Sequence, residues 1–269
     1  MGVIMDLKVK NKIALVTGAT QGIGFATAKK LCLEGAQVII NGRTKEKLDK
    51  AILNIKREFP EANIQGIVAD LKDNEGCNLL ISQIPHIDIL INNLGIFEPR
   101  NFEDISEKEW LHMFNVNVMS GVRLSQHYLS KMIEQDWGRI LFISSESALN
   151  IPQEMIHYGM TKSAQVSVAH GIAQLTRGTN VTCNSVIIGP SKSEGVMTFL
   201  DELGKQENKT FEEIEKEFFA VHRATSLVQR FADVEETANM IVYAASSLSS
   251  MTNGAMLRAD GGIINSAFN

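Results

Sequence analysis

The sequence predicts an α/β protein with a Rossmann-like, doubly wound parallel sheet of about seven strands in three α/β/α layers. Short apolar runs rich in β-branched residues alternate with longer segments of helical period, which indicates βαβ units. The central runs ILIN, ILFI and SVII are apolar without alternation, as expected for strands that helices cover on both faces. A glycine-rich segment, VTGATQGIG, follows the first apolar run.

The elements can be assigned in order along the chain. The predicted strands lie in KIALVTG, AQVIING, NIQGIVAD, IDILINN, RILFISS, NVTCNSVII and AMLRAD. The predicted helices lie in FATAKKLCLEG, KEKLDKAILNIKREF, a stretch after NIQGIVAD, long segments before and after RILFISS, and DVEETANMIVYAAS. Ser106 and Glu109 have the spacing of a capping box at the start of the long middle helix. Gly35 and Gly178 lie where glycines commonly end helices.

One segment interrupts the alternation of strands and helices. Between Gly189 and Asp233 the chain is charged and helical in pattern, and it is too long for an ordinary connection. We therefore predict one domain, residues 1–269, with a lid or substrate-binding insertion at about 190–232. Its apolar residues either cover a bulky, lipid-like substrate or pack the insertion onto the body of the protein. These residues are Met197, Phe199, Leu200, Phe211, Phe218 and Phe219.

Composition excludes several classes of protein. The 269 residues are 44% hydrophobic and 21% charged with a net charge of −5, which predicts a sizeable core and no nucleic-acid partner. No apolar run approaches the roughly 20 residues that span a bilayer, and the N-terminus lacks the apolar stretch of a secretory signal. Cys32, Cys77 and Cys183 lie far apart. Their spacing predicts buried thiols in a reducing cytoplasm, and we expect no metal site and no membrane partner.

The glycine-rich segment predicts a nucleotide site. Gly18, Gly22 and Gly24 lie within seven residues, where the first predicted strand meets the first predicted helix. Such glycines permit positive φ and let main-chain amides approach a pyrophosphate at the N-terminal end of a helix. A plain tight turn is the alternative, but the position in the first βαβ unit favours a dinucleotide.

The segment HYGMTK places Tyr158 and Lys162 four residues apart, on one face of a predicted helix. A free Tyr has a pKa of about 10, and a nearby cation lowers it toward the range useful for proton transfer. The same spacing is common on helix surfaces, so the pair needs support. RILFISSES supplies Ser144 and Ser145 at the carboxyl end of a strand, the edge where open parallel sheets bind ligands.

Together these motifs resemble the short-chain dehydrogenase/reductase family, and within it the 3-oxoacyl-ACP reductase-like members. Residues 17–24 match the family motif Thr-Gly-xxx-Gly-x-Gly, INNLG resembles Asn-Asn-Ala-Gly, and RADGG lies near the C-terminus as in relatives. The motifs follow the family order from Lys12 to Ile263. Leu94 replaces the usual Ala beside the expected position of the cofactor's ribose. Ile188 replaces the usual Pro in the loop expected to receive the nicotinamide carboxamide.

The resemblance implies an NAD(P)(H)-dependent oxidoreductase that transfers hydride between nicotinamide and a carbonyl or secondary alcohol. Tyr158 would be the acid and base, and Ser145, thirteen residues earlier, would bind the substrate oxygen, with Ser144 as the adjacent candidate. Lys162 would lower the Tyr158 pKa and hold the nicotinamide ribose. Asn117 lies within a helix although Asn is a poor helix former. Its main chain would hold a water that links Lys162 to solvent.

The resemblance also implies the cofactor contacts. Gly42 stands where NAD-selective folds place an acidic residue, and Arg43 follows, so NADP(H) is favoured over NAD(H). A solvated surface Arg is the alternative. Asp70 would contact the adenine, cap the next helix, or do both. The expected contacts are Thr17, Gly18, Thr20, Gln21, Gly22, Ile23, Gly24, Arg43, Asp70, Leu71, Asn93, Gly95, Tyr158, Lys162, Gly189, Pro190 and Ser191.

Other functional assignments follow from resemblance alone. A homotetramer or homodimer is expected, with a β-ketoacyl thioester or polyketide-type carbonyl compound as the small-molecule substrate. His157 is a second candidate acid, although adjacent helix residues point about 100° apart, which favours a packing role. The alternative function is a nucleotide-binding regulator or scaffold whose catalysis is vestigial.

Overall fold

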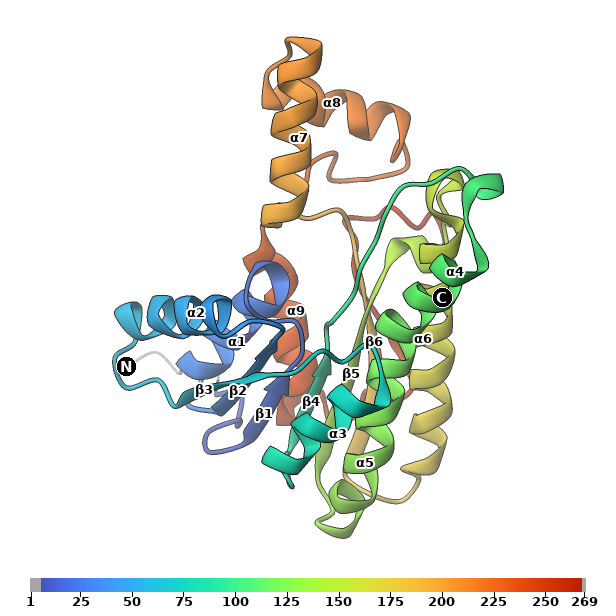
Figure 1. The fold of residues 1–269 in the computed structure, drawn as a ribbon. Coiled ribbons are helices and arrows are strands. Elements are labelled where there is room, and N and C mark those ends of the chain that lie inside the picture. Colours follow the sequence, from blue (N-terminus) through green and yellow to red (C-terminus); the bar gives the residue numbers. More distant parts are fainter. Residues whose placement is uncertain (1–5, 268–269) are drawn as a thin grey trace.

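Seven parallel strands form one sheet (Figure 1) in a computed structural model that describes residues 6–267, with only the main chain described for Phe199. The strands are β1 (Ile13–Val16), β2 (Gln37–Gly42), β3 (Ile64–Val68), β4 (Ile89–Asn92), β5 (Gly138–Ser145), β6 (Val181–Ile188) and β7 (Met256–Ala259). Their order in the sheet is β3-β2-β1-β4-β5-β6-β7. The predicted doubly wound sheet is confirmed. Because the order reverses between β1 and β4, ligands are expected at the carboxyl ends of these strands.

Helices cover both faces of the sheet in the predicted three layers (Figure 1). One face is covered by α1 (Gly22–Leu33), α2 (Lys45–Glu58) and α9 (Val234–Ala245). The other face is covered by α3 (Asn74–Gln83), α5 (Ser120–Glu134) and α6 (Ile156–Leu175). Each layer of helices buries its apolar side chains against the sheet, so two cores lie on opposite sides of it.

The central strand β5 contributes to both cores. All eight of its residues are buried, as the run without alternation predicts. Leu141 and Ile143 pack in the core beneath α1 and α9, whereas Ile140 and Phe142 pack in the core beneath α5 and α6. This division follows because successive strand residues point to opposite faces of the sheet. β5 is therefore a rigid element, and its carboxyl end holds Ser144 and Ser145.

The predicted helix boundaries are largely confirmed. α4 (Glu107–Phe114) begins at a capping box in which Ser106 Oγ accepts from Glu109 N and Glu109 Oε2 accepts from Ser106 N. α4 continues through a π-helix, Asn115–Met119, into α5. Gly35 and Gly178 follow α1 and α6 with φ of 78° and 80°. Short 3-10 helices span Phe102–Asp104, Glu146–Ala148, Gln153–Met155 and Ser247–Ser249.

The helix after β3 is not capped by Asp70, which was one of the two roles predicted for that residue. The N-cap of α3 is Asp73, whose Oδ1 accepts from Gly76 N at 3.0 Å. Asp70 instead accepts from Lys72 N at 3.2 Å and pairs with the Lys72 ammonium. The alternative role of Asp70 as a helix cap is therefore wrong, because two turn residues separate it from the first turn of α3.

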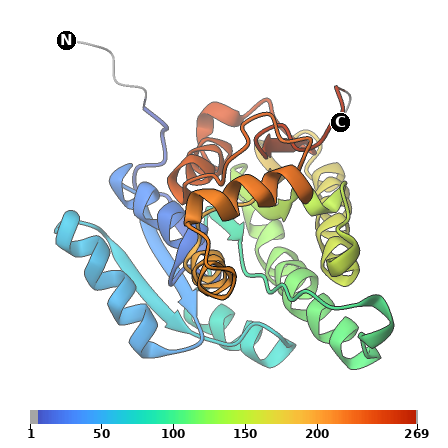
Figure 2. The same ribbon diagram turned by 90° about the horizontal axis from the view of Figure 1, so that it is seen from above.

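The segment between β6 and α9 forms a helical pair above the carboxyl edge of the sheet (Figures 1 and 2). It consists of α7 (Glu194–Glu207) and α8 (Phe211–Val221). Leu200, Ile214, Phe219 and Phe231 form a small core of their own. An isolated bridge between Ser191 and Ala232 pairs the two ends of this segment, and the sequence did not predict it. The division into one domain with an insertion at about 190–232 stays a prediction.

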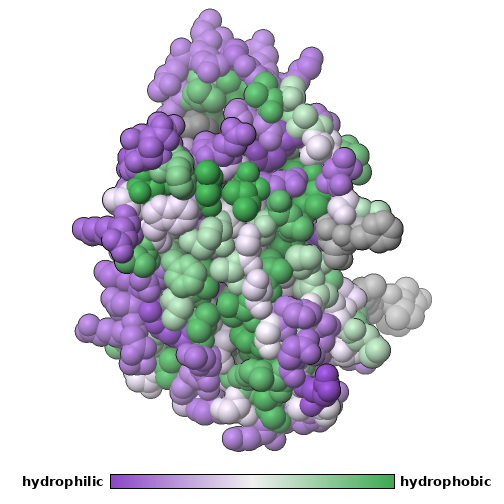
Figure 3. All heavy atoms as spheres, turned by 90° about the vertical axis from the view of Figure 1, so that its right-hand side faces the viewer, coloured by the Kyte–Doolittle hydropathy of each residue, from purple (hydrophilic) through white to green (hydrophobic). Residues whose placement is uncertain are grey.

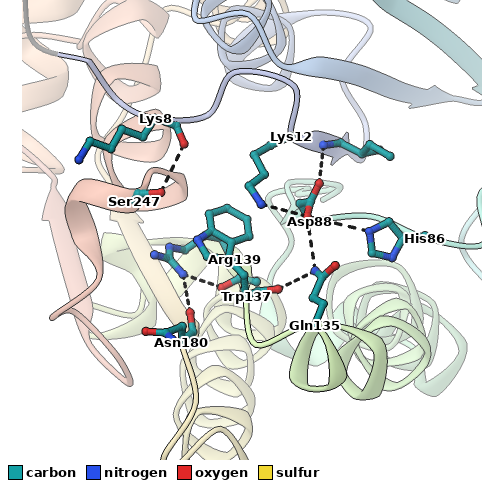
Figure 4. Close-up of polar contacts among 11 residues, drawn as sticks. Lys8, Lys12, His86, Asp88, Gln135, Trp137, Arg139, Asn180 and Ser247 are labelled. Carbon is teal, nitrogen blue, oxygen red and sulfur yellow. Dashed lines mark hydrogen bonds and ion pairs between the residues drawn. The ribbon is translucent and has the colours of Figure 1, made fainter.

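A polar network holds the amino edge of the sheet (Figure 4). Asp88, directly before β4, accepts a hydrogen bond from Ile13 N at 2.8 Å. Its other oxygen accepts from Lys12 Nζ and from Gln135 Nε2, both at 3.4 Å. The carboxylate thus ties the first residue of β1 to the start of β4 and to the end of α5.

Arg139, near the start of β5, is a second centre of this network and is 1% exposed. It donates to the main-chain oxygens of Ser246 at 3.0 Å, Gly138 at 2.8 Å and Asn180 at 2.9 Å. Its guanidinium carbon also lies 4.7 Å from the centroid of the Trp137 ring. Arg139 therefore joins β5 to the segments that precede β6 and follow α9.

Candidate active site

The glycine turn has the conformation that the sequence predicts. Gly18 and Gly22 adopt φ of 61° and 60°, a region that favours glycine. A Cβ on Gly24 would lie 2.4 Å from Asn93 Nδ2, so only glycine fits there. Gln21, the N-cap of α1, makes no side-chain capping bond, which leaves the first amides of α1 available to an anion.

Thr17 and Asn93 brace this turn from within. Thr17 Oγ1 donates to Ile91 O at 3.3 Å and accepts from the main-chain amides of Asn93 and Leu94, each at 3.0 Å. Asn93 Nδ2 donates to Thr17 O at 2.9 Å and to Gly18 O at 3.1 Å. Two residues expected to contact the cofactor thus have their side chains committed to the protein, and they hold the turn in shape.

The end of β2 leaves no room for an acidic side chain. A Cβ on Gly42 would lie 2.5 Å from Thr20 Cγ2 and 3.3 Å from Leu48 Cγ. Arg43 follows and is exposed beside the turn that carries Thr20. The crowding at Gly42 comes from Thr20, a residue of the glycine turn. The sequence of β2 alone could not predict this contact.

Other expected cofactor residues lie along the same edge. Asp70 and Leu71 follow β3, where the Leu71 side chain is buried in the core, so only its main chain faces the edge. Gly189 and Pro190 follow β6, and Ser191 Oγ donates to Gly189 O at 3.1 Å. The glycine turn also meets the insertion, because a Cβ on Gly22 would lie 3.4 Å from Ser193 Cβ.

Ser145 and Tyr158 face a cavity of about 580 Å³ between the carboxyl edge and the insertion. Ser145 Oγ accepts from Ser147 N at 3.1 Å, and its hydroxyl lies close enough to the Tyr158 phenol to act on the pKa of that phenol. Apolar residues of the insertion line the opposite wall. They are Val196, Leu200, Leu203, Ile214, Phe218 and Phe231.

This lining bears on the two interpretations of the insertion. Leu200 and Phe218 line the cavity, whereas Phe219 is 1% exposed and packs within the insertion. Leu200 also belongs to the small core of the insertion, so packing within the insertion is shown for Leu200 and Phe219. Covering a substrate stays a prediction. The side chain of Phe199 lies outside the described residues.

Ser144 and His157 have other partners. Ser144 Oγ donates to Lys162 O at 2.9 Å and is fully buried, so it fastens α6 to β5. The His157 ring packs edge-on against Trp110 at 5.8 Å and is 2% exposed. Burial lowers the pKa of His157, and the ring does not line the cavity. The packing interpretation of His157 is therefore favoured.

Lys162 is placed differently from the expectation. Its Nζ donates to Ile143 O at 2.9 Å and to Gln165 Oε1 at 3.1 Å, and lies 5.5 Å from the centroid of the Tyr158 ring. Burial lowers the pKa of Lys162 to about 7. The pKa of Tyr158 is raised to about 12, mainly by burial, and the neighbouring Ser145 hydroxyl opposes this rise. The lowering of the Tyr158 pKa by Lys162 stays a prediction, since the ammonium donates to Ile143 O and Gln165 Oε1 and not to the phenol.

Asn117 lies in the π-helix and uses its side chain to fix the loop after β4. Its Oδ1 accepts from Ile96 N at 2.8 Å, and its Nδ2 donates to Ile96 O at 2.9 Å and Thr161 Oγ1 at 3.0 Å. Its main-chain oxygen accepts from Gln165 Nε2 at 2.6 Å. In this structure the Gln165 side chain links Asn117 O to Lys162 Nζ, and the expected water stays a prediction. Sequence reasoning missed Gln165, although its place three residues after Lys162 is a signal that could have indicated it.

An ion pair joins the insertion to the residue after Ser145. Arg223 Nε donates to Glu146 Oε1 at 2.8 Å, and both side chains line the cavity. Burial raises the pKa of Glu146, and the pairing with Arg223 opposes that rise. Sequence analysis missed this pair because 77 residues separate its members.

The edge fits a nicotinamide dinucleotide. The glycine turn offers positive-φ glycines and uncapped amides at one end of the edge. At the other end, a Cβ on Gly95 would lie 3.5 Å from Lys162 Nζ and 3.7 Å from Asn117 Oδ1. Gly95, in the loop after β4, therefore lies beside both the Lys162 ammonium and the Asn117 side chain.

Comparison with known proteins decides the family. A family model described as short chain dehydrogenase matches residues 12–204. This chain belongs to the short chain dehydrogenase family. It is 48% identical over 264 residues to the uncharacterized oxidoreductase YvaG of Bacillus subtilis (strain 168), which covers 98% of this chain and 100% of that protein.

Two further relatives of this short chain dehydrogenase are named by activity. The 3-oxoacyl-[acyl-carrier-protein] reductase FabG of Aquifex aeolicus (strain VF5) is 30% identical, covering 96% of this chain and 100% of its own. A crystal structure of a 3-oxoacyl (acyl-carrier-protein) reductase from Agrobacterium tumefaciens C58 with NADP bound has a TM-score of 0.85 at 25% identity, covering 96% of both chains. The expected family is confirmed, and the protein is an oxidoreductase that acts on CH–OH or C=O groups with a nicotinamide cofactor.

Over residues 6–267, no helix combines the length and apolar character that crossing a bilayer requires. Within the same range, no three His, Cys, Asp or Glu side chains gather in a way that could hold a metal ion. Cys32, Cys77 and Cys183 are buried free thiols.

Proposed function

We propose that this dehydrogenase reduces a carbonyl compound reversibly to a secondary alcohol, with Tyr158 as the acid and base. The observation that carries the proposal is the convergence of the Ser145 and Tyr158 hydroxyls in the cavity, with Lys162 buried behind them. When bound, the nicotinamide cofactor supplies or accepts the hydride. All protons and hydrogen bonds come from the protein.

The state of Tyr158 supports the reducing direction. Burial raises the pKa of this phenol to about 12, so at neutral pH it carries a proton that it can donate to a carbonyl oxygen. Ser145 stabilises the negative charge that develops on that oxygen by a hydrogen bond. A protonated Lys162, which lies on the same helix, stabilises the phenolate left after the transfer.

We propose NADP(H) as the preferred cofactor, with NAD(H) as the weaker one. Gly42 leaves no space for the carboxylate that binds adenosine ribose hydroxyls in NAD-selective folds. Arg43 is exposed directly after it and can pair with a 2′-phosphate. The related reductase with NADP bound supports the same preference. Ile23, Gly95, Gly189, Pro190 and Ser191 would line the nicotinamide end, and Asp70 the adenine end.

The cavity supports an extended apolar substrate. Its far wall carries apolar side chains of α7 and α8 together with the charged Glu207 and Glu217, and Ser145 and Tyr158 lie on the side of the sheet. A 3-oxoacyl thioester or a polyketide-type ketone matches this distribution, because one end carries the reacting carbonyl and the other is hydrocarbon. The relative named 3-oxoacyl-[acyl-carrier-protein] reductase is consistent with this class.

We propose that the protein assembles as a homotetramer or homodimer. Figure 3 faces the side of the molecule that carries α4 and α6, where hydrophobic side chains run in a band down the surface. Leu111 on α4 is 55% exposed, and Leu175 at the end of α6 is 66% exposed. Burying such side chains against a second copy would remove apolar surface from water.

The proposal is tested by a cofactor-coupled screen. Purified protein is mixed with NADPH and, in parallel, with NADH, over ketones and 3-oxo esters graded in chain length, and the nicotinamide absorbance is followed. We expect faster oxidation of NADPH on the longer substrates. In Tyr158→Phe, turnover should fall at least about 10³-fold while NADPH binding is retained, because the phenyl ring keeps the shape and loses the proton.

Tyr243→Phe is the matched control, because Tyr243 lies on the outer surface of α9 and is 39% exposed. It should retain wild-type turnover. Near-wild-type activity of Tyr158→Phe on an established substrate would contradict the role of Tyr158. Cofactor binding without oxidation by any carbonyl compound would instead favour a nucleotide-binding regulator.

A further inference from the structure

Gln165 has contacts that a simple packing residue would not need. It lies on α6, one turn after Lys162, and is 1% exposed. Its Oε1 accepts from Lys162 Nζ at 3.1 Å, and its Nε2 donates to Asn117 O at 2.6 Å. Both ends of one amide are therefore used, and they connect α6 to the π-helix.

The π-helix explains why a carbonyl is available there. In Asn115–Met119 the main-chain bonds skip one residue further than in an α-helix, as shown by Ser120 N, which donates to Asn115 O. Such a bulge changes the direction of nearby carbonyls and is frequent at functional sites. Asn117 is held in place by three side-chain bonds to Ile96 and Thr161, so its carbonyl is a fixed point.

We propose that Gln165 is a positioning residue that holds the Lys162 ammonium in place and stabilises its charged form by linking it to the Asn117 carbonyl. This inference rests on the proposed role of Lys162 beside Tyr158. Gln165 is not among the residues that line the cavity, so its amide does not contact a substrate bound there. It acts through Lys162.

The surroundings of Lys162 make this acceptor important. β5 presents the Ile143 carbonyl, the loop after β4 presents Gly95, the π-helix presents Asn117, and α6 presents Tyr158. Tyr158 is the titratable group among them, and no carboxylate of the described residues pairs with the ammonium. Two neutral oxygens, Ile143 O and Gln165 Oε1, accept from the charge. Removing one of them should favour neutral lysine, whereas replacing it by a carboxylate should favour the ammonium.

The test is the titration of Lys162 itself, which needs no substrate. Protein labelled with 13C at lysine Cε is titrated by NMR, and the Lys162 signal is identified by its loss in Lys162→Met. In Gln165→Met, which removes the acceptor with little change in volume, we expect the titration midpoint to fall by about one pH unit. In Gln165→Glu, whose side chain has nearly the same shape, we expect it to rise by about one pH unit or more.

Gln174→Met is the matched control, because Gln174 lies exposed on the same helix and contacts only His170 among the described side chains. It should leave the midpoint unchanged. Equal midpoints in the wild type, Gln165→Met and Gln165→Glu would overturn the proposal, as would shifts of the two variants in the same direction. If Gln165→Met fails to fold, the rise in Gln165→Glu decides.

Kinetics then separate this inference from the proposed function. With an active substrate, the alkaline fall of kcat should move to lower pH in Gln165→Met and to higher pH in Gln165→Glu, with KM within about twofold. If no substrate is turned over while the NMR midpoints shift as expected, the positioning role stands and the proposed reaction fails. If turnover is normal and the midpoints do not move, the reverse holds.

Discussion

The amino and carboxyl edges of the one sheet differ in how their buried charges are held. At the amino edge, Arg139 donates to three main-chain carbonyls, and Asp88 accepts from an amide and two side chains (Figure 4). At the carboxyl edge, Lys162 is 5% exposed and has only two neutral acceptors. Nearby Glu146 leaves one buried oxygen without a hydrogen-bond partner in the described structure.

This difference suggests that the amino edge of the sheet mainly stabilises the fold and the carboxyl edge mainly serves the site. At the strand starts, Arg139 and Asp88 each make three hydrogen bonds that fix the strands and stabilise the fold. Partly paired groups at the strand ends cost stability but keep pKa values away from their ordinary range, as Lys162 and Tyr158 show. Substitutions at the amino edge should therefore affect stability, whereas substitutions at the carboxyl edge should affect binding, turnover and pH dependence.

The largest expected effect lies at the amino edge. Arg139→Met should lower the free energy of unfolding by about 3 kcal/mol, because three buried carbonyls lose a charged donor. Urea unfolding measures this, and kcat under native conditions should stay within about twofold of wild type. Arg177→Met, at an exposed position after α6, is the control and should leave the free energy of unfolding unchanged. If Arg139→Met lost as much turnover as Tyr158→Phe, the idea that the amino edge affects stability and not turnover would be contradicted.

The next effect is the pH dependence that Lys162 imposes on stability. Its pKa is about 7 in the folded protein, against about 10.4 in an unfolded chain. Between these values the unfolded state binds more protons, so stability rises with pH. From pH 7 to pH 9 the wild type should gain about 2 kcal/mol of unfolding free energy relative to Lys162→Met.

Urea unfolding of both proteins at the two pH values measures the difference. Lys216→Met, on the exposed face of α8, should keep the wild-type pH dependence. The same pH dependence in Lys162→Met as in the wild type would show that the buried ammonium does not strain the carboxyl edge.

The smallest effect sharpens the comparison within the carboxyl edge. Arg43→Ala should weaken NADPH binding about tenfold and leave NADH binding unchanged, because an exposed guanidinium contributes mainly its pairing with a phosphate. Cofactor fluorescence titrations measure both affinities, with Arg177→Ala as the control. Equal losses for the two cofactors would mean that Arg43 supports the turn and does not read the 2′-phosphate.

Local patterns predicted much of the framework. The seven strands were placed by their apolar runs, and the start of α4 by the Ser106–Glu109 spacing, because strand burial and capping depend on residues close in sequence. The glycine turn was predicted for the same reason, since positive φ at Gly18 and Gly22 is a local requirement. The alternative role of Asp70 as a helix cap belongs to Asp73, three residues later, and such small displacements are common at element boundaries.

The sequence predicted which residues meet at the carboxyl edge better than it predicted their hydrogen-bond partners, and the roles of these residues stay predictions. The order of motifs brought Ser145, Tyr158 and Lys162 to one edge, as parallel strands require. The four-residue spacing of Tyr158 and Lys162 fixes only the distance between their Cβ atoms. The acceptors of the Lys162 ammonium are set by β5 and by Gln165. The Tyr158 pKa is set mainly by burial, which raises it.

By itself the sequence determined which apolar runs form buried strands, where the turns lie and which family motifs are present. These features depend on periodicity and on the conformational range of single residues. The tertiary structure alone decided the crowding of Gly42 by Thr20, the Glu146–Arg223 pair and the Lys162–Gln165–Asn117 connection. Each joins groups from different elements, and the strength of a buried charge or hydrogen bond is set by neighbours that only packing brings together.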